Sequence, residues 1–125
     1  MGEMRVLVGT KDYAKSTAFY GELLRFPVQD EWDAPDGRGI LFATGGGVIE
    51  VLEDSPHHPA ETPHGVMVSI QVADVDALHA RLTDAGVAPT DSLSNRPWGH
   101  RSFAIRDPNG LPLTFFQLLE GAVAE

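Results

Sequence analysis

RPWGHRSFAIRDPNG, residues 96–110, carries the clearest structural signals of this 125-residue sequence. Its middle alternates in character, with the large apolar Phe103 and Ile105 on one parity and smaller or polar residues on the other, which is typical of a half-buried strand. The Asp-Pro-Asn-Gly run at 107–110 then combines a turn initiator, a fixed φ and a residue that tolerates positive φ. The sequence therefore predicts a β-hairpin whose second arm is the Leu-Thr-Phe-Phe run at 113–116.

Two residues near the start of this segment are candidates for a ligand site. Trp98 has two interpretations, a plug that closes the end of the sheet or a ring presented to a ligand. His100 follows at the mouth of the strand, where an imidazole could contact a ligand or act as a general base. Because the sequence pairs this histidine with no nucleophile, it is assigned no catalytic role.

The composition limits the classes of protein to which the chain can belong. Its length predicts one domain, large enough to bury about two-thirds of its unfolded surface. The absence of Cys excludes disulfides and thiolate metal sites. A net charge of −9 argues against nucleic acid, whose phosphates would be repelled, and no stretch approaches the ~20 apolar residues of a membrane span. We expect a cytoplasmic protein that binds neither nucleic acid nor membranes.

The two halves of the chain repeat one order of elements: a strand, a helix and three strands. Asp12 and Asp74 each stand where a helix N-cap is expected, and Gly86 is placed to end the second helix. The predicted elements of the first half are a strand at 4–8, a helix at 14–24 and strands at 28–32, 40–44 and 48–52. Those of the second half are a strand at 66–72, a helix at 75–85 and strands at 88–93, 101–106 and 113–118.

The register of this repeat is consistent along the chain. Arg5 and Met67 are 62 positions apart, as are the two helix caps, and an offset of about 64 places Thr114 opposite Glu50. The sequence therefore predicts an internal duplication and an α+β fold. One domain would consist of two tandem βαβββ modules at 4–53 and 66–118, a Pro-rich linker at 54–65 and a tail at 119–125.

Duplicated βαβββ modules, an Asp-initiated helix carrying Phe19 and Tyr20, and the late Asp-Pro-Asn-Gly hairpin resemble the vicinal oxygen chelate superfamily. This superfamily contains glyoxalases, bleomycin-resistance proteins and extradiol dioxygenases, and the resemblance extends over residues 4–118. The Pro-Trp-Gly-x-Arg-x-Phe-x-x-Arg-Asp-Pro-x-Gly run that begins at Pro97 resembles the bleomycin-resistance branch in particular. The resemblance implies curved mixed sheets around a cleft, helices on their outer faces, and a homodimer that completes the cleft.

In metal-dependent members of this superfamily four positions hold one divalent ion, and the resemblance places them at Arg5, Glu50, Met67 and Thr114. Only Glu50 offers a good ligand for a hard or borderline cation, because Arg5 brings a permanent positive charge and Met67 a soft thioether. One donor is too few, since such sites need three or more protein ligands. We therefore expect no metal and no other cofactor.

Strand parity divides the predicted strands into a mixed face and an aliphatic face. The aliphatic face is expected to be core under the helices, whereas the mixed face suits a preformed small-molecule cleft. Arg5 and Glu50 could also pair with each other and fill the position of the metal. The mixed face holds Arg5, Leu7, Glu50, Leu52, Met67, Ser69, Gln71, Thr114 and Phe116, and the aliphatic face holds Val6, Val8, Ile49, Val51, Val66, Val68, Ile70 and Val72.

Further candidates are aromatic. Trp32 lies among four carboxylates at 30–36, where a ring and negative charge could hold a cation together. The alternative is an exposed acidic hairpin with this ring packed inward. Phe42 and Phe116 are candidate ligand residues as well, although phenylalanines are more often core residues. We expect the linker histidines to be solvated loop residues: His57, His58 and His64.

These residues favour a non-catalytic protein that binds and sequesters a hydrophobic or cationic small molecule, with an antibiotic or metabolite of the bleomycin kind as the leading ligand class. Aromatic rings would stack on the ligand, and acidic residues would attract its positive charge. The candidate contacts are Arg5, Trp32, Phe42, Glu50, Met67, Gln71, Trp98, His100, Thr114 and Phe116. Two alternatives stay open. One is a lyase, isomerase or dioxygenase, metal-dependent through relocated ligands or metal-free with Glu50 as base; the other is a domain whose role is association.

Overall fold

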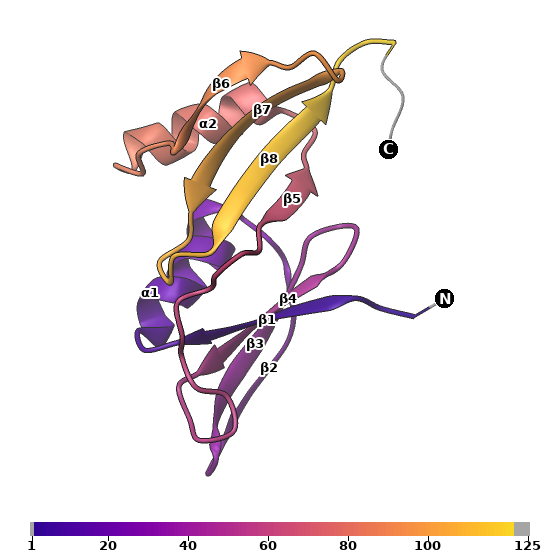
Figure 1. Cartoon of the computed structure of the whole chain (residues 1–125). Coiled ribbons are helices and arrows are strands. Elements are labelled where there is room, and N and C mark those ends of the chain that lie inside the picture. The colour runs from indigo at the N-terminus through magenta and orange to yellow at the C-terminus, as the bar shows by residue number, and fades with distance from the viewer. Residues whose placement is uncertain (1, 122–125) are drawn as a thin grey trace. The chain divides into compact units, whose positions relative to one another are not determined.

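The computed structural model describes residues 2–121, which form two four-stranded sheets, each with its own helical region (Figure 1). The chain divides into two compact units, Met1–Pro63 and His64–Glu125. The first contains β1 (Arg5–Thr10), α1 (Tyr13–Ala18), the π-helical turn η1 (Phe19–Leu23), β2 (Val28–Ala34), β3 (Gly37–Ala43) and β4 (Val48–Glu53). The second contains β5 (Val68–Gln71), α2 (Val75–Asp84), β6 (Asp91–Asn95), β7 (His100–Arg106) and β8 (Pro112–Leu118). The predicted order of elements and the α+β class are confirmed.

Both sheets share one topology. Their strand orders are β1-β4-β3-β2 and β5-β8-β7-β6, with the first and last strands of each unit paired in parallel and the other pairs antiparallel. Leu7 pairs with Glu50 in the first sheet, and Ser69 pairs with Thr114 in the second. Leu7 and Ser69 are 62 positions apart, and Glu50 and Thr114 are 64 positions apart, so the predicted register of the duplication is confirmed.

Both helices begin at the predicted aspartates. The carboxylates of Asp12 and Asp74 each accept a hydrogen bond of 3.0 Å from the backbone N–H three residues later. Gly86 terminates helix α2 as predicted: it follows the C-cap residue Ala85 and takes a φ of 86°. The N–H of Val87 then donates to the carbonyl of Leu82 at 3.0 Å, which completes a Schellman motif.

The first helical region departs from the regular helix predicted at 14–24. After α1 it widens into η1, where the N–H of Leu24 donates to the carbonyl of Phe19, five residues earlier. Phe19 and Tyr20, although consecutive, are both buried in this turn. The region ends at Arg25, which takes a φ of 61° where α2 uses a glycine.

Replacing Arg25 with glycine is expected to stabilise the protein. Left-handed backbone costs a residue with a Cβ about 1 kcal/mol, and the greater unfolded-state entropy of glycine offsets part of the gain, so we expect the free energy of unfolding to rise by about 0.5 kcal/mol. Urea denaturation measures this change. Arg25→Ala keeps the Cβ and should show no such gain, and a loss of stability in Arg25→Gly would contradict the argument.

Each sheet buries one face beneath its helix. In the first unit the ring of Tyr20 packs against Phe42 with a centroid separation of 5.8 Å, and in the second Phe103 packs against Phe115 at 5.5 Å. Most buried strand residues follow the predicted parity. On that parity they are Val8, Ile40, Phe42, Ile49 and Val51 in the first unit and Ile70, Phe103, Ile105, Leu113 and Phe115 in the second. The opposite parity also holds buried residues, among them Leu52 of the predicted mixed face: Leu41, Val48, Leu52 and Ser102.

Strand boundaries differ from the prediction at β6, which spans Asp91–Asn95 where 88–93 was predicted, and also at β5. This strand starts at Val68, so Val66 and Met67, predicted to be strand residues, precede it and are exposed. The placement of Val66 in the core was wrong, because the residue lies outside the ladder that the helix covers. The hairpin of β2 and β3 is longer than predicted and leaves only Pro35 and Asp36 between its strands.

The turn from β7 to β8 is organised by Asp107, which is buried. Its Oδ1 accepts the backbone N–H groups of Asn109 and Leu111, each at 2.8 Å. Its own N–H donates to the carbonyl of Leu111 at 2.9 Å, and Gly110, with a φ of 87°, donates to the carbonyl of Asp107 at 3.0 Å. The hairpin predicted from the opening segment is therefore confirmed.

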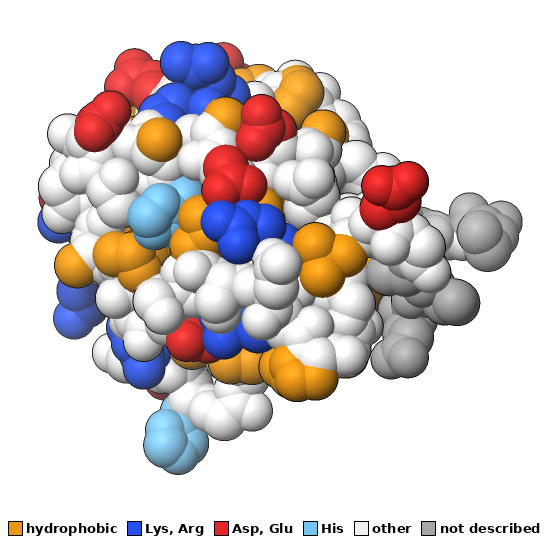
Figure 2. All heavy atoms as spheres, turned by 90° about the horizontal axis from the view of Figure 1, so that it is seen from above, with side chains coloured by type: hydrophobic (Ala, Val, Ile, Leu, Met, Phe, Trp, Pro, Cys, Tyr) orange, Lys and Arg blue, Asp and Glu red, His pale blue; other side chains and the backbone are white. Residues whose placement is uncertain are grey.

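The surface carries charges of both signs. Figure 2 shows acidic and basic side chains next to one another on one face, with hydrophobic side chains between them. Within residues 2–121, no helix has the length and apolar character that crossing a membrane requires.

Candidate functional site

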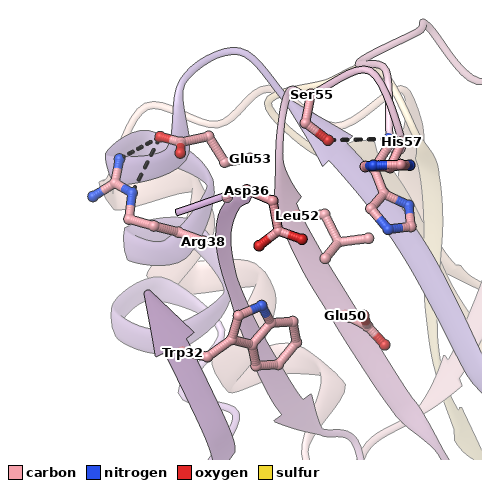
Figure 3. A pocket seen from close by; sticks show the side chains of 10 residues that line it. Trp32, Asp36, Arg38, Glu50, Leu52, Glu53, Ser55 and His57 are labelled. Carbon is pink, nitrogen blue, oxygen red and sulfur yellow. Dashed lines mark hydrogen bonds and ion pairs between the residues drawn. The ribbon is translucent and has the colours of Figure 1, made fainter. Parts of the chain in front are cut away.

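A hollow of about 150 Å³ lies on the first sheet, between β2, β3 and β4 on one side and the loop after β4 on the other. Figure 3 shows the carboxylate of Asp36 and the side chain of Leu52 beside the indole of Trp32, with Glu50 farther along β4, while Arg38 and Glu53 point toward each other at one side. The lining residues are Trp32, Asp36, Gly37, Arg38, Glu50, Leu52, Glu53, Ser55, His57 and His58. The hollow thus combines an aromatic ring, carboxylates and imidazoles.

Trp32 is positioned by the residue opposite it. Trp32 on β2 pairs with Gly39 on β3, and its indole lies so closely over this glycine that a Cβ there would clash with three ring atoms. Trp32 is nevertheless 37% exposed. It is therefore held against the sheet while part of its surface stays open to the hollow, a combination of the two arrangements that the sequence left open.

Arg38 forms hydrogen bonds and a ring contact with neighbouring side chains at the side of the hollow. Its Nε and Nη2 donate to Oε2 of Glu53 at 3.1 and 2.7 Å, and its guanidinium carbon lies 4.4 Å from the ring centroid of Tyr13. The hydrogen bond to Glu53 raises the pKa of Arg38, and burial raises the pKa of Tyr13. This clamp neutralises Glu53, so Asp36 and Glu50 supply the net negative charge of the lining.

Arg5 and Glu50 form the ion pair that the sequence left open. Nη1 of Arg5 lies 3.3 Å from Oε1 of Glu50, and its Nε lies 2.5 Å from Oε1 of Glu3. The hydrogen bond with Glu3, followed by that with Glu50, raises the pKa of Arg5, and Arg5 lowers the pKa of Glu3. The Glu50 side chain is only 13% exposed, so a nearly buried carboxylate shares one cation with a second acid.

The four positions that correspond to metal ligands do not offer a suitable donor set. A guanidinium stands beside Glu50, Met67 is exposed before β5, and Thr114 is a half-buried hydroxyl in β8. Guanidinium donates hydrogen bonds only, and a thioether is a poor ligand for hard cations. Across the described part of the chain, no three His, Cys, Asp or Glu side chains are grouped to hold a metal ion. These residues do not fit a divalent ion.

The second sheet carries an aromatic pair on the face away from α2. The ring of His100 stacks on Phe116 with a centroid separation of 4.3 Å and an interplanar angle of 11°. We call these two rings the aromatic platform. Gln71 shares this face, since it is the strand partner of Phe116, and Thr114 lies two residues before Phe116 on β8. The structure therefore brings four of the predicted contact residues onto one sheet face.

Trp98 lies in the turn before β7 and is 59% exposed. Its ring therefore does not close the end of the sheet, which was one of the two interpretations of the sequence. The turn itself is fixed by backbone hydrogen bonds, since Gly99 donates to the carbonyl of Arg96 and accepts from the N–H of Leu119. The indole is thus presented from an ordered turn.

Phe42 does not lie with the other candidate residues. It is 1% exposed and packs against Tyr20 on the helix-covered face of β3, where its edge also contacts Gly21. Its neighbour Leu41, on the opposite parity, is the strand partner of Glu50. Phe42 is therefore a core residue and is not part of the candidate site.

Several lining residues were missed from the sequence. Asp36 belongs to the acidic run around Trp32, and that run was a usable signal. His57 and His58 are exposed, as expected for linker residues, but they also line the hollow. They arrive there because Ser55 and His58 exchange backbone hydrogen bonds of 3.1 and 3.2 Å, a turn that the sequence did not identify.

Comparison with known proteins places this geometry in a family. Residues 4–115 match the sequence profile of the Glyoxalase/Bleomycin resistance protein/Dioxygenase superfamily. The uncharacterized protein YaeR of Escherichia coli (strain K12) is 34% identical over 116 residues, which cover 85% of this chain and 88% of YaeR.

Solved structures show the same fold. TnmS3, an antibiotic binding protein from Streptomyces sp. CB03234, is 28% identical with a TM-score of 0.72, over 94% of this chain and 96% of TnmS3. A glyoxalase/bleomycin resistance protein/dioxygenase from Nocardioides shares the fold at 19% identity and a TM-score of 0.71, over 100% of this chain and 88% of its own. The chain therefore belongs to the Glyoxalase/Bleomycin resistance protein/Dioxygenase superfamily.

Proposed function

We propose that this protein binds and sequesters a hydrophobic or cationic small molecule, an antibiotic or metabolite, without converting it chemically. The observation that carries the proposal is the aromatic platform, together with the exposed indole of Trp98 on the same unit. The half-buried rings of the platform and the exposed indole of Trp98 offer stacking surface to a planar ligand group. Sequestration needs affinity alone, and no nucleophile paired with a base is required for it.

The donor chemistry at the metal positions supports binding over metal-assisted catalysis. Arg5 stands beside the one carboxylate among those positions, at 3.3 Å from Glu50. Similarity to TnmS3, an antibiotic binding protein, supports the same ligand class.

We further propose that the protein acts in the cytoplasm as a homodimer. Leu7 is 53% exposed on the open face of the first sheet, and Met67 is exposed beside β5. Apolar side chains of this size gain roughly 1.5–3 kcal/mol each from complete burial, and a second copy of the chain would cover them.

Replacing Trp98 with alanine is expected to weaken binding of bleomycin, our probe for this ligand class, by at least about 10-fold, because truncation of a tryptophan at the centre of a binding surface costs about 2 kcal/mol or more. Isothermal titration calorimetry measures the affinity without relying on tryptophan fluorescence. Val28→Ala, which removes another exposed apolar side chain in the first unit, is the matched control and should leave the affinity unchanged.

Three outcomes would count against the proposal. Unchanged affinity in Trp98→Ala would remove Trp98 from the site. One tightly held divalent ion per chain after purification without chelator would contradict the metal-free assignment. A failure of the wild-type protein to bind bleomycin, other cationic glycopeptides or planar aromatic antibiotics would overturn the binding function itself.

A further inference from the structure

We propose that the hollow beside Trp32 is a seat for an organic ammonium group, built from residues other than the aromatic platform. The inference rests on the proposed function, because it names the charged group of a ligand of that class, and the seat lies wholly within the first unit. Three properties of the hollow carry it: its charge, its ring and its size.

The charge of the hollow is negative and only partly balanced. Glu53 is neutralised by two hydrogen bonds from Arg38. Glu50 meets Arg5 through a longer contact of 3.3 Å, and Arg5 is shared with Glu3 at 2.5 Å. Asp36 adds a further carboxylate from the β2–β3 turn. A cation that enters the hollow therefore meets negative charge, and the nearly buried position of Glu50 limits its screening by water.

The indole of Trp32 is a second, independent recognition element. A cation near the ring of a tryptophan is attracted by the ring's quadrupole, whatever carboxylates surround it. Gly39 fixes this ring against the sheet, so the ring loses little freedom when a ligand arrives. Figure 3 shows Asp36 and Leu52 beside the ring and Glu50 farther along β4, and all four side chains line the hollow.

The volume of the hollow fits a small ammonium group but not a whole drug-sized ligand. Its volume of about 150 Å³ is close to that of a protein cavity known to hold benzene, and it is below the roughly 300 Å³ at which drug-sized pockets begin. A trimethylammonium or alkylammonium group matches this space, and methyl groups on nitrogen would contact Leu52 and the indole. A bare metal ion is a poorer match, because the described residues provide no group of three suitable ligands.

The test compares choline with its neutral isostere 3,3-dimethylbutan-1-ol in full-length Trp98→Phe protein, where Trp32 provides the one remaining indole N–H signal in a ¹H–¹⁵N spectrum. Choline should shift this signal to saturation, and the isostere should bind at least about 10-fold more weakly. Glu50→Gln and Asp36→Asn should each weaken choline binding by about 3-fold or more. Glu22→Gln removes the same charge from η1, outside the hollow, and should have little effect.

A second variant separates the ring from the charge. Gly39→Ala alters no charge but forces the indole away from the sheet, so choline binding should fall in this variant too. Equal binding of choline and its isostere, or unchanged binding in both Glu50→Gln and Gly39→Ala, would overturn the inference. If the wild-type protein still binds bleomycin in that case, the proposed function stands without the ammonium seat. If the wild-type protein binds neither choline nor any of the antibiotics tested, both the ammonium seat and the proposed function are wrong.

Discussion

Asp107→Ala is expected to lower the free energy of unfolding by about 3 kcal/mol, because it leaves two backbone N–H groups, one buried and one partly buried, without their acceptor. Oδ1 of Asp107 accepts from Asn109 and from Leu111 at 2.8 Å each, and Leu111 is itself buried. Hydrogen bonds to an ionised acceptor contribute more than neutral ones, so the loss should exceed that of an ordinary turn residue. Urea denaturation followed by circular dichroism measures the change.

The matched control is Asp107→Asn. Asparagine keeps an oxygen at the position of Oδ1 and loses only the charge, so its cost should be about 1 kcal/mol. Equal losses in the alanine and asparagine variants would show that the charge, not the two hydrogen bonds, holds the turn. A loss below about 1 kcal/mol in Asp107→Ala would show that the turn forms without this side chain.

The features that the sequence predicted correctly are those whose causes are local. The Asp-Pro-Asn-Gly turn, the aspartate caps and Gly86 each act through backbone groups within a few residues. The period-2 alternation also identified the buried faces, because a strand exposes its two parities to different surroundings. Register followed from the repeat, since Leu7 and Ser69 occupy equivalent places in equivalent ladders.

The features that the sequence did not reveal depend on contacts between distant residues. The widening of the first helix into η1 accompanies the burial of both Phe19 and Tyr20 against the sheet, and no local signal announced it. The indole of Trp32 settles on Gly39 because the β2–β3 register brings the two together. His57 and His58 reach the hollow through the fold of the loop after β4, whose path also runs against Gly9 at Pro59.

The sequence predicted that Arg5 and Glu50 lie on one sheet face, but it did not show whether they pair with each other or contact a ligand. Parity placed both side chains on one face, and only the structure shows that they approach to 3.3 Å. The pairing neutralises the charge of Glu50 only in part, because Arg5 is shared with Glu3. The same carboxylate can therefore contribute both to the fold and to the attraction of a cationic ligand.

Phe42 and Phe116 were both predicted as candidate ligand residues, but the structure places one in the core and the other on the open sheet face. Phe42 is 1% exposed under Tyr20, so Phe42→Ala should cost about 4 kcal/mol of unfolding free energy, the usual range for a buried aromatic truncated to alanine. Phe116 is only half-buried on the open face, where it stacks with His100, so Phe116→Ala should cost about 1.5 kcal/mol. Chemical denaturation of both variants gives the two values.

Binding should show the opposite order. Phe116→Ala removes half of the aromatic platform and should weaken bleomycin binding by at least about 10-fold, whereas Phe42→Ala should bind normally whenever it is folded. Calorimetry below the unfolding transition of each variant separates affinity from stability. Equal effects of the two variants on stability, or a larger effect of Phe42→Ala on affinity, would contradict the assignment of the open face as the ligand surface. The helix-covered face would then have to contribute to recognition, through a cavity that its present packing around Tyr20 does not provide.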